Sequence, residues 1–206
     1  MPLVVVSHPL VEDVLTRLRD RATPCDEFRR LARRVSLLLA VESTRDLRLE
    51  QVAVMTPLEP TTGKRLAGRV VAVPVLRAGL GMLDAFLELV PQAEVGYFGL
   101  ERNEDTAIAR RYYEKVPRDL KGAVVFLLDP MLATGGSAAM ALDGLLGLGA
   151  VDIRLLSIVT APEGIAHLQK AAPQVAVYTA AVDRRLNDRK YILPGLGDFG
   201  DRLFGT

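Results

Sequence analysis

Residues 127–140, LLDPMLATGGSAAM, carry one acid, two hydroxyls and two adjacent glycines between a hydrophobic run and a helical pattern. In an open α/β sheet, ligands bind at the carboxyl ends of the strands, where helix N-termini present free N–H groups. Gly135 and Gly136 would let backbone amides approach an anion closely. Thr134 and Ser137 would add hydroxyl donors. The loop therefore predicts a cradle for a phosphate monoester.

Asp129 ends the hydrophobic run and begins this loop. A carboxylate is a poor neighbour for phosphate but a good acceptor for sugar hydroxyls, so the acid and the cradle together suggest a ribose 5-phosphate. An ordinary strand-to-helix turn, with Ser137 as the N-cap, remains an alternative interpretation of the same residues.

Other phosphate and metal sites lack the residue types that they need. No Lys accompanies Gly135–Ser137, so the loop is not a Walker A motif. The GLGDFG stretch at 195–200 imitates a dinucleotide loop but has no helical pattern behind it. A single cysteine, Cys25, and two histidines, His8 and His167, are too few for a Cys- or His-based metal site.

Continuous apolar runs alternate with helical patterns from Arg69 onward, which predicts the scaffold that positions the loop. Runs such as VVAVPVL and AVVFLLD lack in-and-out alternation, as expected for strands that are covered on both faces. Helical patterns between the runs imply right-handed crossovers. The predicted fold class is α/β, a doubly wound and mostly parallel sheet.

We expect a single domain over 1–206, with a helical appendage at about 1–45, a core at about 69–182 and a C-terminal segment at about 187–206. The appendage has helical spacing over Pro9–Arg19. A second helix is predicted with Thr23 as N-cap and Pro24 at its first position, and its apolar face is a core or subunit contact. Residues 103–119 predict a protruding hairpin or lid. The last twenty residues are irregular but apolar enough to predict an ordered tail.

Composition excludes bulk electrostatic binding. The chain has 26 basic and 25 acidic residues and a net charge of +1, which gives no general attraction to nucleic acid or to an anionic membrane. Its first residues, MPLVVVSHPL, lack a basic n-region and are too short for a signal peptide or membrane span. A soluble, cytoplasmic protein is the expectation.

VVFLLDPMLATGGS resembles the phosphoribosyl-diphosphate (PRPP) loop of type I phosphoribosyltransferases, in the variant where Pro130 replaces the usual second acid. Together with PVLRAGLGM (74–82), ERNEDT (101–106), APEGI (161–165) and YILPGLGDFGD (191–201), it is similar to the uracil phosphoribosyltransferase family over nearly the whole chain. The resemblance implies the type I fold with N-terminal helices, a hairpin lid and a C-terminal base-binding hood. It also implies pyrimidine salvage, in which uracil N1 and PRPP give UMP and diphosphate through an oxocarbenium-like transition state.

By this resemblance, Arg77 and Arg102 bind the diphosphate and act in catalysis together with Asp198. Mg²⁺ is expected mainly through PRPP oxygens, with no protein metal site. The residues expected to bind PRPP are Arg77, Arg102, Asp129, Pro130, Met131, Leu132, Ala133, Thr134, Gly135, Gly136, Ser137 and Asp198. The lid is placed at 104–115, where AIARRYYEK departs from the Pro-containing pattern of the family. Tyr112 and Tyr113 either touch substrate or pack the hairpin.

The uracil site is expected in the irregular backbone of the C-terminal segment. Uracil presents an acceptor, a donor and an acceptor, so a complementary site offers a donor, an acceptor and a donor. By resemblance Ile192, Gly197, Asp198 and Phe199 frame the base, and cytosine would leave buried polar groups unpaired. Phe199 replaces the small residue of the family pattern, so its ring is expected to pack elsewhere. Asp198 is the candidate general base by position, or it orients the base.

Several alternatives remain open from the sequence. The enzyme could use another nucleobase, or the chain could be a PRPP-sensing regulator that binds RNA, although neutral charge does not favour a nucleic-acid partner. A binding module without catalysis is the third alternative. The resemblance leaves GTP as a possible effector, and the apolar N-terminal helices suggest a homodimer or higher homo-oligomer.

Overall fold

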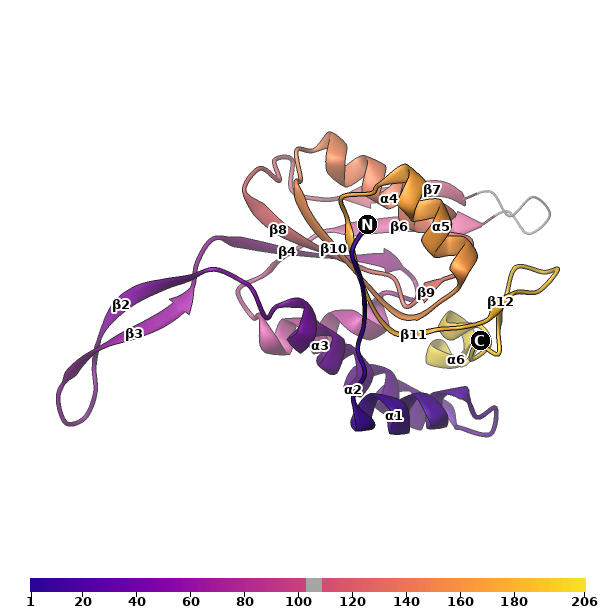
Figure 1. Ribbon diagram of the computed structural model, residues 1–206, viewed down its shortest axis with the longest axis horizontal. Helices are drawn as coiled ribbons and strands as arrows, with labels where there is room; N and C mark the ends of the chain where they lie inside the picture. Colours follow the sequence, from indigo (N-terminus) through magenta and orange to yellow (C-terminus); the bar gives the residue numbers. More distant parts are fainter. Residues whose placement is uncertain (103–108) are drawn as a thin grey trace.

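The computed structural model describes residues 1–102 and 109–206 (Figure 1). Residues 103–108, together with the side chains of Arg102 and Ala109, lie outside the described part. The tip of the predicted lid is therefore not described.

Among the described residues, nine strands form one central sheet (Figure 1). The order is β1-β11-β10-β8-β4-β6-β7, while β5 pairs with β4 and β9 pairs with β10. All neighbours are parallel except β6 and β7. The strands are β1 (Leu3–Val5), β4 (Arg69–Leu76), β5 (Glu94–Val95), β6 (Tyr97–Arg102), β7 (Ala109–Lys115), β8 (Ala123–Leu128), β9 (Met131–Leu132), β10 (Asp152–Thr160) and β11 (Ala176–Val182). The predicted α/β class is confirmed.

Helices cover both faces of this sheet (Figure 1). On one face lie α1 (Pro9–Arg19), α2 (Cys25–Ser43) and α3 (Leu80–Leu89), and on the other lie α4 (Gly136–Gly147) and α5 (Pro162–Ala171). Two hydrophobic clusters fill the layers between helices and sheet. The strands are apolar on both sides because each side faces one of these clusters.

The N-terminal helices follow the prediction closely. In α1 the ring of His8 caps the helix by accepting a 3.0 Å hydrogen bond from the Leu10 amide. Helix α2 begins one residue later than expected, with Pro24 as N-cap, because the Thr23 hydroxyl donates to the Arg17 carbonyl instead. The apolar face of α2 is buried within the chain, so it is a core contact and does not by itself support a subunit interface.

The antiparallel hairpin of β2 (Leu49–Met55) and β3 (Pro60–Leu66) was not anticipated from the sequence. It projects from the body of the molecule (Figure 1). Leu49, Met55 and Leu58 on it are 55%, 75% and 95% exposed. Large hydrophobic side chains that are this exposed often mark a surface that contacts another molecule.

The C-terminal segment is ordered, as expected, but it is more regular than its sequence indicated. We call residues 187–206 the hood. Its elements are β13 (Ile192–Leu193), which pairs with β12 (Arg185–Leu186), and α6 (Phe199–Phe204). Phe199 is 2% exposed and its ring meets that of Phe28 at 5.2 Å between centroids, so this side chain packs into the core against α2.

One remaining sequence expectation needs a small correction. The run 94–100 was expected as one strand but breaks at Gly96, whose amide donates to Ala72, into β5 and β6. Within the described residues no helix is both long and apolar enough to cross a membrane. The Leu76–Arg77 and Leu193–Pro194 peptide bonds are cis.

Candidate active site

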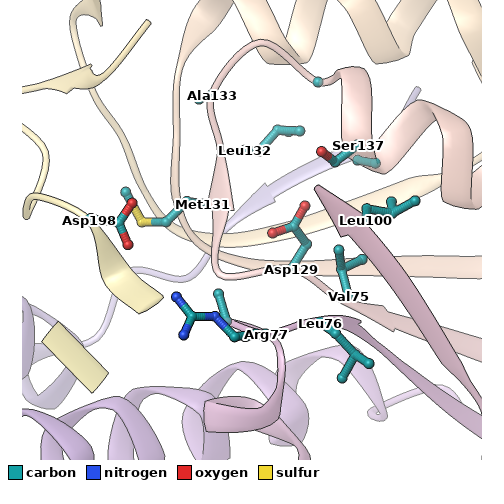
Figure 2. Close-up of a pocket in the computed structure, with 13 residues that line it drawn as sticks. Val75, Leu76, Arg77, Leu100, Asp129, Met131, Leu132, Ala133, Ser137 and Asp198 are labelled. Carbon is teal, nitrogen blue, oxygen red and sulfur yellow. The ribbon is translucent and has the colours of Figure 1, made fainter. Parts of the chain in front are cut away.

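A pocket of about 240 Å³ lies at the carboxyl ends of β4 and β8 (Figure 2). These strands are parallel neighbours in which Pro74 pairs with Leu128, so the residues that follow them meet at one edge of the sheet. Figure 2 shows the Asp129 carboxylate pointing into the pocket, with Arg77 and Asp198 on one side and Ser137 on the other. The predicted acid and cation are thus brought together.

The first half of the 129–137 loop is fixed to β10 by hydrogen bonds. The Asp129 amide donates to Leu156 at 3.1 Å, and the Pro130 carbonyl accepts from Ile158 and Val159 at 2.9 and 3.1 Å. The Leu132 amide donates to the buried Ser157 hydroxyl at 3.1 Å. Pro130 suits this position because only its carbonyl is used.

The second half of the loop turns into α4 through a left-handed glycine. Gly135 has a φ of 81°, a conformation that L side chains rarely adopt, and it is the N-cap of α4. No side chain caps this helix, so the alternative interpretation with Ser137 as N-cap is wrong. The helix start therefore keeps its amides for another acceptor.

The hydrogen bonds of the described residues show which loop amides are already used. The Ala133 amide donates to Met131, and the Gly136 amide is 3.4 Å from the Thr134 hydroxyl. None of the described hydrogen bonds uses the amides of Gly135 or Ser137. Of the loop amides predicted to bind an anion, that of Ala133 is thus already used, and those of Gly135 and Ser137 at the start of α4 are not.

Helix α5 supports the loop from behind, a role that sequence reasoning missed. A Cβ on Gly164 would lie 2.5 Å from the Ala133 carbonyl oxygen and 2.9 Å from that of Leu132. His167 Nδ1 lies 3.0 Å from the Thr134 carbonyl oxygen. In the sequence, APEGI (161–165) contributed only to the family resemblance. Its glycine, Gly164, was the signal that could have indicated a close approach between two backbone segments.

The same helix also contacts the segment that leads into the hood. The Leu186 amide donates to Glu163 at 2.9 Å, and this hydrogen bond lowers the pKa of the Glu163 carboxyl below its ordinary value. Glu163 and His167 line a further pocket, of about 360 Å³, together with Thr134. One helix thus touches both the 129–137 loop and the base of the hood.

Arg77 lines the pocket but also reaches toward α6. Its Nη2 lies 3.5 Å from Asp201 Oδ1, and its guanidinium carbon is 5.7 Å from the Phe204 ring centroid. Its side chain is 59% exposed, and an exposed ion pair of this kind contributes only about 0–1 kcal/mol. The guanidinium is therefore readily available to an anionic ligand.

A second pocket, of about 820 Å³, adjoins the first at the hood. It is lined by Ile192 and Gly197, as predicted, and by residues 188–191, which were not predicted. Asn187 organises that stretch because its Oδ1 accepts from the Arg189 and Tyr191 amides at 3.0 and 2.9 Å. The volumes of both pockets are in or near the range of small-molecule sites, ~300–1,000 Å³.

Asp198 belongs to both pockets, as do Met131 and Ala133. Its Oδ1 also caps α6 by accepting a 3.0 Å hydrogen bond from the Asp201 amide. A carboxylate at the junction of two pockets is placed to contact two ligands that meet there.

The other predicted site residues are distributed as follows. Leu132, Gly135 and Ser137 also line the first pocket, and Thr134 lines the pocket beside α5. Pro130, Gly136 and Phe199 are not among the residues that line these pockets. The backbone of Arg102 ends β6, while its side chain lies outside the described part. Residues of the first pocket that were not predicted are Val75, Leu76, Ala78, Leu100 and Ala138.

The described part of the lid is a hairpin of β6 and β7, as predicted. The ring of Tyr112 and the Cβ of Tyr113 lie so close to Gly99 that a Cβ there would come within 2.6 and 2.7 Å of them. Neither tyrosine is among the described residues that line the two pockets. In this structure the tyrosines pack the hairpin.

The mostly parallel sheet, with Asp129 and Arg77 at its carboxyl edge, has the fold of the type I phosphoribosyltransferase class. A hypoxanthine-guanine phosphoribosyltransferase from Bacillus anthracis shares this fold, with a TM-score of 0.51 at 12% identity over 78% of this chain and 79% of that chain. A structure from Aquifex aeolicus is much more similar, with a TM-score of 0.95 at 38% identity over 99% of this chain and 98% of that chain.

Residues 5–206 match the family model described as uracil phosphoribosyltransferase. Curated uracil phosphoribosyltransferases from Streptococcus equi subsp. zooepidemicus and Streptococcus agalactiae are 51% and 50% identical over 98% of this chain and 97% of theirs. The chain belongs to the uracil phosphoribosyltransferase family.

The close contact between Gly164 and the 129–137 loop gives a prediction. Gly164→Ala should push the Ala133 carbonyl away and displace the loop, which should lower kcat/KM for PRPP on the order of 10–100-fold. Steady-state kinetics at saturating nucleobase measure this.

Gly147→Ala is the matched control, because nothing lies within 4 Å of a Cβ there. It should leave kcat/KM unchanged and shift stability by at most about 1 kcal/mol. Equal kinetics for both variants would show that α5 does not position the loop.

Proposed function

We propose that this chain transfers the 5-phosphoribosyl group of PRPP to N1 of uracil, which gives UMP and diphosphate. Family membership supports the reaction. The observation that carries the proposal to this chain's own residues is the pair of adjoining pockets that share Asp198. Two ligands whose reacting atoms must meet require such a junction.

The first pocket is proposed for PRPP. The amides at the start of α4 hold the 5-phosphate, and the Asp129 carboxylate accepts from the ribose hydroxyls. Arg77 and Arg102 bind the diphosphate, whose charge grows as it departs from an oxocarbenium-like transition state. With a net charge of only +1, the protein compensates this polyanion through local groups.

The second pocket is proposed for uracil. Ile192 and Gly197 line it, and their backbone groups would supply the donor and acceptor pattern that the base requires. Asp198 orients the base or accepts its N1 proton. Cytosine would place an amino group against a donor, so we expect strong discrimination against it.

Magnesium is proposed to bind mainly through PRPP. Among the described residues no group of three or more His, Cys, Asp or Glu side chains could hold a metal. The pocket carboxylates of Asp129 and Asp198 fit a cation whose other ligands are substrate oxygens. The bound ion would offset phosphate charge, while this chain's residues orient the two substrates.

GTP activation and a cytoplasmic location remain predictions. We also propose a homo-oligomer, with the β2–β3 hairpin as its contact surface. The N-terminal helices no longer support it, because they bury their apolar faces within the chain. Leu49, Met55 and Leu58 on the β2–β3 hairpin are more than half exposed. Covering them with a second copy would remove this apolar surface from water.

The reaction is tested by incubating the protein with PRPP, Mg²⁺ and each nucleobase. UMP should form from uracil, at least about 10²-fold faster than product forms from cytosine, hypoxanthine or orotate. Parallel reactions with and without GTP measure activation, and omission of Mg²⁺ should abolish turnover. Absence of UMP under all these conditions would contradict the proposal.

Asp198→Asn tests the shared carboxylate. Asn keeps an oxygen that can cap α6, so the fold should persist while turnover falls by roughly 10²-fold. Circular dichroism checks the fold and steady-state assays measure kcat. Unchanged rates would remove Asp198 from the catalytic residues.

Assembly is tested by light scattering. The expected mass is at least twice the 22.4 kDa of one chain. Replacing Leu49, Met55 and Leu58 together by Ser should lower that mass toward one chain without unfolding the monomer, because these side chains are exposed in it. A mass of 22.4 kDa for the unmodified protein would rule out the proposed oligomer.

A further inference from the structure

Three side chains form hydrogen bonds to the backbone of the hood at Gly195 and Leu196. The Gly195 amide donates to Asp183 Oδ2 at 2.8 Å, and the Gly195 carbonyl accepts from Arg19 Nη1 at 2.8 Å. The next carbonyl, that of Leu196, accepts from Arg202 Nη1 at 2.7 Å. Arg19 is 176 residues away from Gly195 in the sequence, whereas Asp183 precedes Gly195 by 12 residues.

Arg19 and Asp183 form a two-pronged ion pair. Arg19 Nη1 and Nη2 donate to Asp183 Oδ2 and Oδ1 at 2.8 and 2.7 Å, and the Asp183 side chain is only 6% exposed. Arg19 ends α1, and Asp183 follows β11, where its amide donates to Thr160 at 2.8 Å. Removing one partner of such a pair leaves a buried charge uncompensated, so the pair fixes its surroundings firmly.

Arg202 completes the connection from the hood side. Its Nη1 also donates to the Leu18 carbonyl, and its Nη2 donates to the Asp20 carbonyl at 2.6 Å. These carbonyls belong to the C-terminal end of α1, which lacks partners inside the helix. The guanidinium lies 4.4 Å from the Phe28 ring centroid, and burial lowers its pKa, although Asp20 opposes this shift.

The anchored residues lie between two residues that line the second pocket. Gly195 and Leu196 belong to the stretch 193–196, which separates Ile192 from Gly197, and both Ile192 and Gly197 line that pocket. The turn is tight, because a Cβ on Gly195 would lie 2.2 Å from the Ile192 carbonyl oxygen. Any shift of Gly195 therefore moves Ile192 or Gly197.

We propose that Arg19, Asp183 and Arg202 are positioning residues for the nucleobase, which set its affinity without touching it. None of the three lines either pocket. The inference rests on the proposed function, since it assumes that the hood binds uracil. The end of α1 lies about 180 residues before the hood in the sequence, and the inference gives it a part in base recognition.

A buried arginine elsewhere in the chain provides the control. Arg154 is 6% exposed and donates to the Ser43 carbonyl at 2.6 Å, and it pairs with Asp46 and Asp152. Like Arg19, it ties the end of a helix to the sheet, but it does not line either pocket and does not contact the hood. Its loss should cost stability without changing base affinity.

The experiment compares Arg19→Met with Arg154→Met in kinetics and thermal unfolding. Arg19→Met should raise KM for uracil at least about tenfold, the usual effect of losing a hydrogen bond to a charged group, and leave KM for PRPP within about twofold. Arg19→Lys should restore part of the uracil affinity. Arg154→Met should lower the melting temperature with both KM values unchanged. Equal changes of both KM values, or no change for uracil, would overturn the proposal.

Two further measurements keep the result decisive. If Arg19→Met does not fold, the isosteric Asp183→Asn should show the same selective rise in KM for uracil, and an unchanged value overturns the proposal. If the unmodified protein forms no UMP, the proposed function fails on its own. Amide hydrogen exchange then tests whether Asp183 holds the hood backbone in place. Faster exchange confined to residues 192–198 in Asp183→Asn supports it, and unchanged exchange overturns it.

Discussion

The left-handed turn at Gly135 is the constraint on which the rest of the site depends. It turns the chain from the end of the 129–137 loop into α4, and it places Gly135 and Ser137 at the first pocket. Because the net charge of the protein is only +1, local groups such as the backbone dipoles at a helix start and nearby arginines must compensate a polyanionic ligand. The hydrogen bonds from β10 to Pro130 and the contact with Gly164 hold that turn in place.

The two pockets are built by different means. The first lies on the sheet, where parallel pairing of β4 and β8 brings Arg77 and Asp129 together. The second is formed by the hood, which has little regular structure and depends on contacts with α1 and α2, while α5 contacts Leu186 just before it. Rigid strands can position a site directly, whereas a loop needs side chains from its neighbours to do so.

Sequence patterns predicted those features that depend on residues close together in the chain. The strands could be identified because burial on both faces demands continuous apolar runs, and the loop that lines the first pocket could be identified because glycines and an acid adjoin one of them. The β2–β3 hairpin was missed because its residues are largely exposed, so they carry no burial pattern. The roles of Arg19 and Gly164 were also missed. Their partners lie far away in sequence, and only the folded chain brings them together.

Arg77 connects the two halves of the site. In this structure its guanidinium lies near Asp201 of α6, and the same side chain lines the pocket assigned to the phosphorylated sugar. Both partners of that ion pair are more than half exposed, so solvent screens it and exchanging the acid for a phosphate costs little. A diphosphate offers more charge and two-pronged geometry, and it therefore competes well for the guanidinium. One arginine can thus contact the hood while the sugar site is empty and contact the leaving group once that site is filled.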